Sequence, residues 1–564
     1  MRGQAAGRAV RVRRIAGALL LVAAVVNLAS ALTPPFRHRL QAISDDYPLA
    51  LHEAATAFTA VTGIALLQLA RGVRRGQRWA WAAALLVLTL SAAAHVLKGL
   101  DVEEATLALA AVAFLAANSR HFRAPTDRPS LRRGTTTILL GALVAIAAGT
   151  IGVQISRHRT SWPHAVAAVT GRLVGSTSIS LGGGRFDTTI TLTLAAVAIG
   201  LAVSVGWLLV RPVLGHGGGS VGISFADARD LVARYGGDTL SYFALRDDKH
   251  HVRIGDTLIS YATRNGVCLV SPDPIGPAAD REAAWAAFRD HVTSQGWSVA
   301  VLGASEDWLP TYRASGMAER YIGDEAIVDV GSFSLDGGAM KGLRQAVNRV
   351  AKYGYTIEFH DPASIDPALA ERLSRLMGES RRGQVERGFS MTLSRVFDGR
   401  DTGLLLAVCR GPDGEPAAFC QYVPAGDIGG YSLDLMRRSE GEHPNGLTDF
   451  VVVRTIERLR ADGHRGLSLN FATMRAVLAG EMGDSVGRRV EKRVMQHLSD
   501  SMQIESLWRY NAKFQPAWRR RYLAYDSPEH LVAVGIAVAG AEQFRELPLV
   551  GRFLPAAAPV LAAP

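Results

Sequence analysis

Cysteine and charge are both scarce in this chain of 564 residues. The three cysteines, Cys268, Cys409 and Cys420, are too few and too irregularly spaced for a disulfide framework or a zinc site. We therefore expect reduced thiols that pack as small apolar residues. Only 20% of the residues are charged whereas 48% are hydrophobic, and this balance favours a protein that lies partly in lipid.

Acidic residues are outnumbered by basic ones, which gives a formal net charge of +11 and a pI near 9.8. A basic balance of this size indicates an anionic partner, and a membrane surface and a nucleic acid both qualify. The length of the chain allows three or four domains.

Six apolar stretches occupy the first 211 residues. Most of them reach the ~17–25 residues that a helix needs to cross a bilayer core, and the fourth is shorter. Arginine-rich and arginine-poor connections alternate between them, so the amino terminus and everything after Val210 are predicted to be cytoplasmic. We predict a basic cytoplasmic tail at 1–14 and a multi-pass cell membrane domain at 15–211, with spans at Ile15–Leu32, Ala54–Ala70, Ala80–Leu97, Ala105–Ala117, Thr137–Ile155 and Thr189–Val210.

The same residues allow two alternatives to a membrane anchor. Ala29-Ser30-Ala31 resembles a signal-peptide cleavage site, but further apolar stretches follow it. A transporter would need ionisable groups along its path, and the stretches hold few beyond His52, Glu53 and His95, which we expect near the membrane interfaces. A membrane anchor is therefore favoured over an ion pathway.

A mixed pattern of helices and strands follows a glycine-rich linker at 212–222. We predict one α+β block at 223–334, a second at 335–552, and a disordered tail at 553–564 that is rich in alanine and proline. Two successive blocks of this kind indicate a duplicated fold. The first contains a helix at Asp280–Gln295 and strands at Thr257–Thr263, Gly266–Val270, Trp297–Gly303 and Glu325–Val330.

The second block begins with a basic helix at Ala339–Lys352. A second helix, Leu447–Ala461, has one apolar face and a suitable C-terminal glycine in Gly463. The apolar stretch Leu531–Ala541 is too short to span a bilayer, so it is expected to be a core or interfacial helix. The predicted strands of this block are Tyr355–His360, Leu404–Arg410, Ala417–Val423, Tyr431–Met436 and Leu467–Phe471.

Six short segments between Phe225 and Tyr525 occur in the order known from one protein family. They are Ser271–Pro277, Lys341–Arg349, Arg387–Met391, Ser432–Arg438, Pro444–Phe450 and Leu507–Phe514. Through them the chain resembles the multiple peptide resistance factor family, the lysylphosphatidylglycerol synthases. The resemblance implies an α-helical membrane domain followed by an α+β tandem GNAT-like catalytic domain, in which the second GNAT-like block carries the chemistry.

The resemblance also implies a reaction: an amino acid (lysine, or alanine or ornithine) moves from an aminoacyl-tRNA to the glycerol hydroxyl of phosphatidylglycerol. The product changes the surface charge of the membrane and its resistance to cationic peptides. One ester replaces another, so we expect no cofactor and no metal, and aminoacyl-tRNA serves as a co-substrate that is charged elsewhere. The implied partners are aminoacyl-tRNA, phosphatidylglycerol and the membrane; a homo-oligomer stays open. Six spans leave no room for the lipid-flipping helices of the longest relatives.

This transesterification needs a proton acceptor, a stabilised oxyanion and cations that hold two phosphate-bearing substrates. Asp434 is the predicted proton acceptor, or alternatively the ligand of the α-amino group of the donor. Arg437 is predicted to hold a phosphate or the oxyanion, because its planar guanidinium binds either with two hydrogen bonds. The alternative for both residues is a structural salt bridge between them.

Basic residues elsewhere in the second block suggest where the substrates bind. The basic helix presents cations along one side, and a loop near Arg387 could close over the site. The aromatic and basic run up to Arg521 suits a single-stranded acceptor end, and suits a lipid interface equally well. A merely solvated basic face is the alternative for the helix. The predicted substrate-binding residues are Lys341, Arg344, Asn348, Arg382, Glu386, Arg438 and Lys513.

Other functions remain as alternatives. An acetyl-CoA-dependent enzyme would use a glycine-rich turn that opens a helix, but the one match, Arg313–Ala318, is predicted to end a helix and lead into a strand. A peptidoglycan-precursor aminoacyltransferase shares the chemistry, but those enzymes are soluble or peripheral. A membrane transporter or sensor with a degenerate GNAT-like domain is disfavoured because Asp434 and Arg437 are retained.

Overall fold

The computed structural model describes most of the chain in two compact units. The described residues are 2–32, 49–99, 102–122, 124, 142–155 and 160–173, scattered positions between 179 and 200, and then 223–381, 388–393, 395–473 and 504–542. The first unit is Met1–His216 with Arg289–Trp297, and the second is Gly217–Phe288 with Ser298–Pro564.

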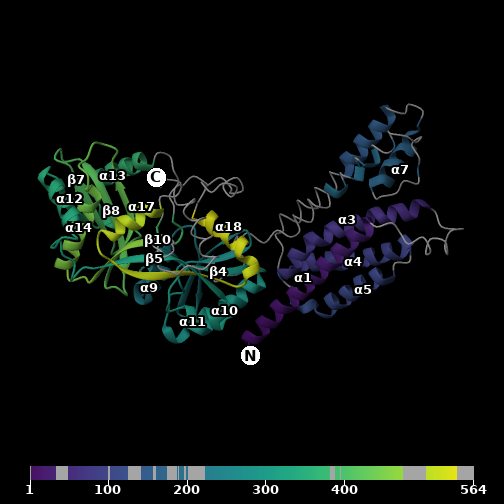
Figure 1. Cartoon of the computed structure of the whole chain (residues 1–564), viewed down its shortest axis with the longest axis horizontal. Helices are drawn as coiled ribbons and strands as arrows, with labels where there is room; N and C mark the ends of the chain where they lie inside the picture. The colour runs from purple at the N-terminus through teal and green to yellow at the C-terminus, as the bar shows by residue number, and fades with distance from the viewer. Residues whose placement is uncertain are drawn as a thin grey trace. The chain divides into compact units, whose positions relative to one another are not determined.

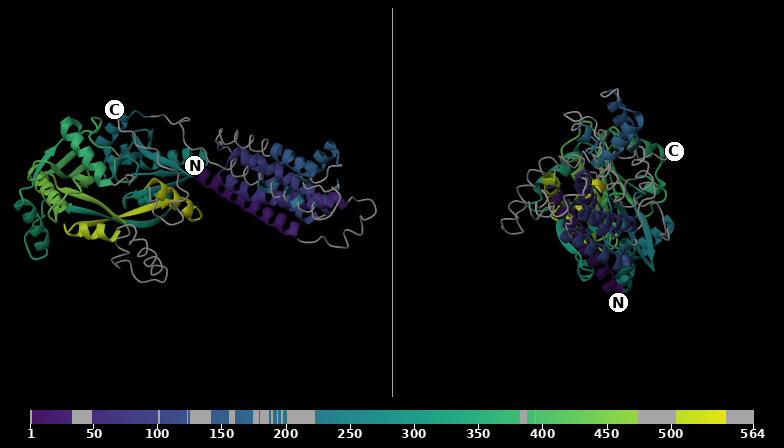
Figure 2. Two further views of the ribbon diagram at one scale, coloured as in Figure 1. Left: turned by 90° about the horizontal axis from the view of Figure 1, so that it is seen from above. Right: turned by 90° about the vertical axis from the view of Figure 1, so that its right-hand side faces the viewer.

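Long helices of the first unit form an antiparallel bundle, in which each packs against the next and the first also contacts the last (Figure 1). Figure 2 shows the same helices side by side from above. Their shared core is rich in alanine, which lets the helix backbones approach closely, as is common between helices in membranes. The bundle helices are α1 (Arg2–Leu32), α3 (Leu49–Arg74), α4 (Arg78–Gly99) and α5 (Val102–Ala117), and α7 (Trp162–Leu173) follows.

Two segments of this bundle, Arg11–Ser30 and Arg78–Val96, are long and apolar enough to cross a membrane. Helices α3 and α5 cover the second and fourth predicted spans, and a shorter apolar helix at Ala142–Ile155 coincides with the fifth. Much of the sixth, Thr189–Val210, lies outside the described residues. The count of six spans and the multi-pass topology therefore stay predictions.

A buried polar cluster joins three helices of the bundle. The Nδ2 of Asn27 donates to the hydroxyls of Thr62 at 3.0 Å and Ser91 at 2.7 Å, and the Nε2 of His95 lies 3.0 Å from the Oδ1 of Asn27. His95 is fully buried, so it belongs to the interior of the bundle and not to its surface. Bonds of this kind between helices fix how they are rotated against each other.

The second unit contains an eleven-stranded sheet in the order β1-β2-β3-β4-β11-β5-β10-β9-β8-β7-β6. Only the pairs β3–β4 and β9–β10 are parallel. The strands are β1 (His250–Ile254), β2 (Thr257–Arg264), β3 (Val267–Val270), β4 (Ser298–Ala304), β5 (Ala318–Asp329), β6 (Thr356–His360), β7 (Leu405–Arg410), β8 (Pro416–Ala425), β9 (Gly430–Arg438), β10 (Gly466–Thr473) and β11 (Ala517–Tyr525).

Helices cover both faces of this sheet (Figure 1). Two consecutive residues of β8 point to opposite sides of the sheet. Phe419 packs in a cluster with leucines of α13, and Cys420 packs in a cluster with residues of α12 and α14. We call these sides the α13 face and the α14 face. The helices are α9 (Phe225–Tyr235), α10 (Arg281–Ser294), α11 (Leu309–Ala314), α12 (Lys341–Lys352), α13 (Pro367–Arg381), α14 (Leu447–Ala461), α17 (Ile504–Ala512) and α18 (Leu531–Ala541).

The two halves of the sheet repeat one connection. Strands β1, β2 and β3 form an antiparallel meander, and α10 then crosses over to β4, which is parallel to β3. Strands β7, β8 and β9 repeat this meander, and α14 leads to the parallel β10. The last strand of each half is exchanged: β5 pairs with β10, and β11 pairs with β4. The exchange joins both halves into one sheet.

Every predicted strand is present, most within one or two residues of its predicted ends. Strand β5 is the exception, because it begins at Ala318 and not at Glu325. Strands β1 and β11 escaped prediction since their sequences, His250–Ile254 and Ala517–Tyr525, are rich in histidine and arginine. Arg313–Ala318 does end α11 and lead into β5, as predicted. The predicted domain boundaries stay predictions.

Candidate functional site

Asp434 occupies a β-bulge in strand β9. In the pairing of β8 with β9, Gln421 lies opposite Leu435 and Tyr422 lies opposite Leu433, so Asp434 is an extra residue with no partner position. A bulge of this kind bends the strand and redirects a side chain, and bulges are frequent beside active sites.

The bulge brings Asp434 and Arg437 to the same face of the sheet. Residues three apart on a regular strand point to opposite faces. Here Leu433 and Met436 both pack on the α14 face, whereas Leu435 packs on the α13 face, as the extra residue requires. Asp434 bonds to the side chain of Gln421, and Arg437 pairs with Phe419, so both lie on the α13 face.

The carboxylate of Asp434 is buried and accepts two hydrogen bonds. The backbone N–H of Leu393 donates to its Oδ1 at 2.8 Å, and the Nε2 of Gln421 donates to its Oδ2 at 2.7 Å. Burial raises the pKa of Asp434 to about 6 against the effect of these two bonds. A carboxylate with this pKa is mostly ionised at neutral pH and is basic enough to accept a proton.

Arg437 is half-buried on the same face, and its Nη1 donates to the carbonyl of Met436 at 2.8 Å. Burial lowers the pKa of Arg437, and the charge of Asp434 opposes this shift. Among the residues that the structure describes, no ion pair joins Asp434 to Arg437. The structural salt bridge that was the alternative for these residues is therefore not what holds Asp434 in place.

The site lies where two parallel strands separate. β9 and β10 pair only at Tyr431 with Leu467 and at Ser432 with Ser468. Asn470 then takes a left-handed conformation with φ +71°, and its Nδ2 donates to Leu433 O at 3.0 Å. Asn470 thus bridges the widening gap with its side chain.

Two buried polar atoms beside Asp434 have no hydrogen-bond partner in the described part of the chain. They are the hydroxyl of Ser432 and the Oε1 of Gln421. Ser432 neighbours Leu433, which packs on the α14 face, so its hydroxyl lies on the α13 face with Asp434. Buried polar groups are normally satisfied, so both atoms are available to a substrate.

A loop at Gly388–Leu393 covers this site and is held at most of its residues. The Nη1 of Arg246 donates to the carbonyls of Gly388 at 2.9 Å and Thr392 at 3.0 Å. The Nδ2 of Asn470 donates to Met391 O at 3.1 Å. With the bond from Leu393 to Asp434, these contacts fix the loop against the bulge.

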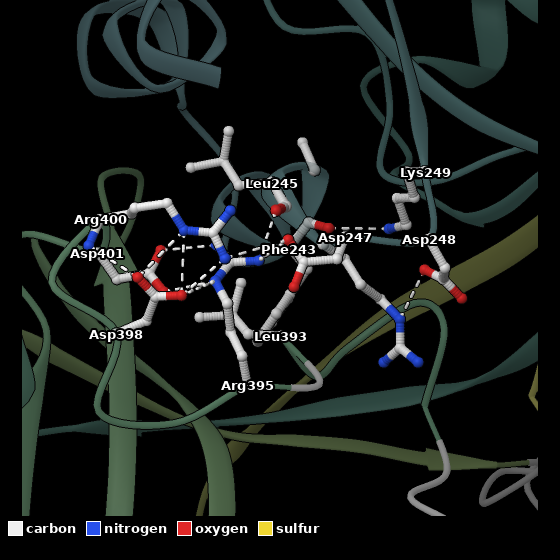
Figure 3. A network of polar contacts seen from close by, with 12 residues as sticks. Phe243, Leu245, Asp247, Asp248, Lys249, Leu393, Arg395, Asp398, Arg400 and Asp401 are labelled. Atoms are coloured by element: carbon white, nitrogen blue, oxygen red, sulfur yellow. Dashed lines mark hydrogen bonds and ion pairs between the residues drawn. The ribbon is translucent and has the colours of Figure 1, made fainter. Parts of the chain in front are cut away.

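An ionic network continues from the loop (Figure 3). The guanidinium of Arg395 bonds to both carboxylate oxygens of Asp401 at 2.7 Å and donates to Leu245 O at 2.8 Å. Figure 3 shows Asp398 and Arg400 converging on the same group, with Leu393 directly beside it. Because Leu245 ends a short 3-10 helix (Ser241–Leu245) that precedes β1, this network fastens the loop to the segment before the first half of the sheet.

A hollow of about 510 Å³ opens at the exchanged strands β5 and β11. Its wall residue Ile327 pairs with Ser468, and Ser468 pairs with Ser432, so this part of the wall faces the same side as Asp434. Three strand spacings of ~4.8 Å separate β11 from β9, which is about 14 Å. The lining residues are Glu306, Ile327, Ala517, Trp518, Arg519 and Arg520.

The predicted binding residues of α12 lie on the other side of the sheet, since α12 packs against α14. Lys341 and Asn348 are exposed, and Arg344 donates to Leu335 O and Gly337 O. The structure therefore does not bring this helix together with Asp434.

Lys513 is also on the α14 face. Its Nζ pairs with Asp449 at 3.0 Å and lies 4.8 Å from the ring centroid of Tyr510. Arg438 is exposed and pairs with Ala418, which packs on the α14 face, so it points away from Arg437. Arg382 and Glu386 lie outside the described residues. The binding roles of all of these residues stay predictions.

Gln421, Ser432 and Asn470 were not singled out from the sequence as site residues. Gln421 interrupts the apolar run of β8, and such an interruption in a buried strand is the signal that could have found it. In the described residues no group of three or more His, Cys, Asp or Glu side chains lies close enough to hold a metal ion.

Comparison with protein families identifies one match. The family model described as phosphatidylglycerol lysyltransferase, C-terminal, matches residues 229–525, which is more than half of the chain. The match includes the bulge at Asp434, the loop at Gly388–Leu393 and both exchanged strands, and it ends before α18.

Curated relatives carry the name lysylphosphatidylglycerol biosynthesis bifunctional protein LysX. The protein of Rhodococcus opacus is 38% identical over 331 residues, which cover 57% of this chain and 29% of the relative. The protein of Rhodococcus jostii is 32% identical over 569 residues, which cover 97% of this chain and 50% of the relative. The chain thus spans half or less of the length of these relatives.

A solved structure of L-PGS from Bacillus licheniformis has a TM-score of 0.50 against this chain, with 23% identity. It covers 58% of this chain and 99% of the solved chain. This likeness concerns the fold alone, and it confirms that the C-terminal part has an α+β fold like that of the solved chain.

Proposed function

The chain belongs to the phosphatidylglycerol lysyltransferase C-terminal family, and from this premise we propose that it transfers an amino acid from aminoacyl-tRNA to the glycerol hydroxyl of phosphatidylglycerol. Lysine is the first candidate, because the names of the curated relatives specify lysylphosphatidylglycerol; alanine and ornithine are the others. The single observation that carries the proposal is the buried carboxylate of Asp434, which a bulge places beside the gap between β9 and β10.

Asp434 acts as the proton acceptor in this proposal. The glycerol oxygen attacks the ester carbonyl of the aminoacyl-tRNA and forms a new C–O bond, while its proton passes to Asp434. The tetrahedral intermediate then breaks its C–O bond to the terminal ribose of the tRNA, and the leaving oxygen recovers the proton from Asp434. One ester replaces another, so neither an oxidant nor a nucleotide is consumed.

Arg437 supplies the positive charge on the same face. A guanidinium there stabilises the oxyanion or a substrate phosphate with paired hydrogen bonds. The hydroxyl of Ser432 and the amide of Gln421 offer further polar contacts beside it. These groups are fixed by the fold before substrate arrives, which is what electrostatic stabilisation of a transition state requires.

The hollow beside Trp518, Arg519 and Arg520 suits the acceptor end of the tRNA. Arginines can pair with phosphates, and Arg519 lies on the α13 face with Asp434 because it pairs with Glu325. Trp518 pairs with Ala326 and packs on the α14 face, so its ring is not beside Asp434. Strand β9 lies about 14 Å from β11, so in this proposal the acceptor end extends from the hollow across the sheet to Asp434. In the proposed topology the six spans hold this unit at the cytoplasmic face, where both substrates are present.

The test uses the full-length chain in vesicles that contain phosphatidylglycerol. Lysyl-tRNA with a labelled lysine is added, and the lipids are analysed by mass spectrometry. We expect lysylphosphatidylglycerol, and we expect it to disappear after ribonuclease treatment. Alanyl- and ornithyl-tRNA supplied in parallel identify the donor. Folded protein that leaves the lipid unmodified with all three donors would contradict the proposal.

A further inference from the structure

Helix α18, Leu531–Ala541, is composed of apolar residues and glycine throughout. Its inner side packs on the sheet, where Val534, Ala537 and Ala541 share a core cluster with residues of β2, β3 and β4. Its outer side is open: Val532 is 76% exposed and Ile536 is 36% exposed. With 11 residues the helix is too short to span a bilayer. It therefore presents an apolar ridge with no charge on the surface of the second unit.

The helix is joined directly to the loop over the site. Glu542, the residue that ends α18, is buried, and its Oε1 accepts hydrogen bonds from the N–H of Ser390 at 3.0 Å and from its hydroxyl at 2.7 Å. The ring of Phe389 lies in the same core cluster as the inner side of α18. The Nζ of Lys249 lies 4.5 Å from the centre of that ring.

The same loop reaches Asp434 three residues later, through the bond from the N–H of Leu393. Helix α18 is thus linked, through Ser390 and the loop residues up to Leu393, to the hydrogen-bond partner of Asp434. None of the residues 526–542 lies in the segment that the family model matches.

We propose that the outer side of α18 lies against the lipid surface, and that Glu542 and Phe389 connect this contact to the loop that positions Asp434. This inference rests on the proposed function, in which the acceptor is a lipid headgroup. A lipid surface is the occupant because the same chain carries two helices that can cross a bilayer, so the unit is tethered beside one. An uncharged ridge beside a site for a lipid hydroxyl buries apolar area among the headgroups without a charge penalty.

The contact can be measured without any catalysis. The native cysteines are all buried, so Val532→Cys in the full-length chain offers one accessible thiol for an environment-sensitive fluorophore. The labelled protein is placed in phosphatidylglycerol vesicles with a quencher attached to the acyl chains. We expect strong quenching and a blue shift at position 532. Tyr353→Cys, at a 63% exposed position after α12, is the control and should show neither effect.

Equal and weak quenching at both positions would overturn the inference. A blue shift at position 532 without lipid quenching would also overturn it, because it would indicate a protein partner on α18. Both results stand whether or not the chain modifies lipid, so they separate this inference from the proposed function.

The coupling to the loop is tested with two forms of the acceptor. Val532→Asp should lower turnover on vesicle phosphatidylglycerol on the order of tenfold and leave turnover on a dispersed short-chain analogue unchanged, because only the first depends on the surface. Tyr353→Asp is the matched control. Glu542→Gln should lower turnover on both forms, since it weakens the link to Ser390. An equal loss of both activities in Val532→Asp would mark a structural defect and contradict the proposal.

Discussion

The two parallel strand pairs of the sheet share a connection but differ in how far they stay paired. β3 and β4 pair at four consecutive positions, from Val267 with Ser298 to Val270 with Val301. β9 and β10 pair at two positions and then separate beside Asp434. The parallel strands of the first half thus stay paired over the stretch in which the parallel strands of the second half separate.

Each pair has a buried aspartate nearby. Asp273 follows β3, and its carboxylate accepts bonds from the N–H of Ser305 at 2.8 Å and from the hydroxyl of Tyr312 at 2.6 Å. Ser305 directly follows β4, so Asp273 ties together the ends of its parallel strands. Asp434 is bonded instead to a loop from elsewhere in the chain.

Burial raises the pKa of both carboxyl groups to about 6, and at Asp273 the negative charge of Asp238 adds to the shift. A raised pKa therefore does not identify a catalytic group by itself. What distinguishes Asp434 from Asp273 is the open strand pair beside it and the arginine on its face. In the proposed function, one half of the fold uses a buried aspartate to tie two strands together, whereas the other half offers a buried aspartate to a substrate.

The largest expected effect separates the two aspartates. Asp434→Asn should lower turnover by about 10²–10⁴-fold, the usual range for loss of a general base, while the protein remains folded. Asp273→Asn is the matched control and should keep turnover within about tenfold, because it alters only the closed pair. Lysyl transfer and thermal unfolding are measured on both. Equal losses of turnover in Asp434→Asn and Asp273→Asn would show that Asp434 has no catalytic role that Asp273 lacks.

Arg437→Lys should have the next largest effect. An ammonium group cannot reproduce the paired hydrogen bonds of a guanidinium, so we expect kcat/KM to fall by about 10–100-fold. Arg458→Lys, in an exposed pair with Asp462 on α14, is the control for a surface arginine and should be neutral. If Arg437→Lys keeps full kcat/KM, a single point charge suffices at that position. The prediction that the paired hydrogen bonds of the guanidinium are needed is then wrong.

Asn470 tests the open end of the strand pair. Asn470→Gly keeps the left-handed conformation but removes the bonds to Leu433 and Met391, so turnover should fall about tenfold with little loss of fold. Asn470→Ala adds backbone strain of about 1–2 kcal/mol and should lower the unfolding temperature further. Identical unfolding temperatures for the two variants would show that the conformation is not strained.

Much of the fold was predictable because the short apolar runs and the apolar alternation of strands β2 to β10, like the apolar face of α14, are local signals. The exchange of β5 and β11 was not, since it depends on pairing between residues about 200 positions apart. The sequence of β11 predicts a basic binding segment, because three consecutive arginines hide the apolar alternation of a strand. Arg521 is nevertheless buried, where it pairs with Glu325.

The site was predictable only in part. The resemblance of Ser432–Arg438 to a known family identified Asp434 and Arg437. A regular strand would place them on opposite faces, and only the bulge, which no local pattern announces, unites them. The positive charge of helix α12 predicts that the helix binds substrate, yet the helix packs on the α14 face. Charge in sequence says little about the face of a sheet to which a helix belongs.

The smallest expected effect is on the pH dependence of stability. A carboxyl whose folded pKa is about 6 and whose unfolded pKa is 3.8 holds its proton more tightly in the folded chain. The contribution of these two carboxyls to stability is therefore fully present below pH 4 and is lost as the pH rises from about 4 to about 6. Activity should run the other way and reach a plateau above pH 6, because Asp434 must be ionised to accept a proton. Each Asp→Asn variant should remove its own carboxyl's share of this decline, because the amide does not titrate. Only Asp273→Asn should keep the activity profile. Unfolding is followed by tryptophan fluorescence in detergent between pH 4 and 6. The same pH dependence in the intact chain and in both Asp→Asn variants would show that neither carboxyl is buried as described.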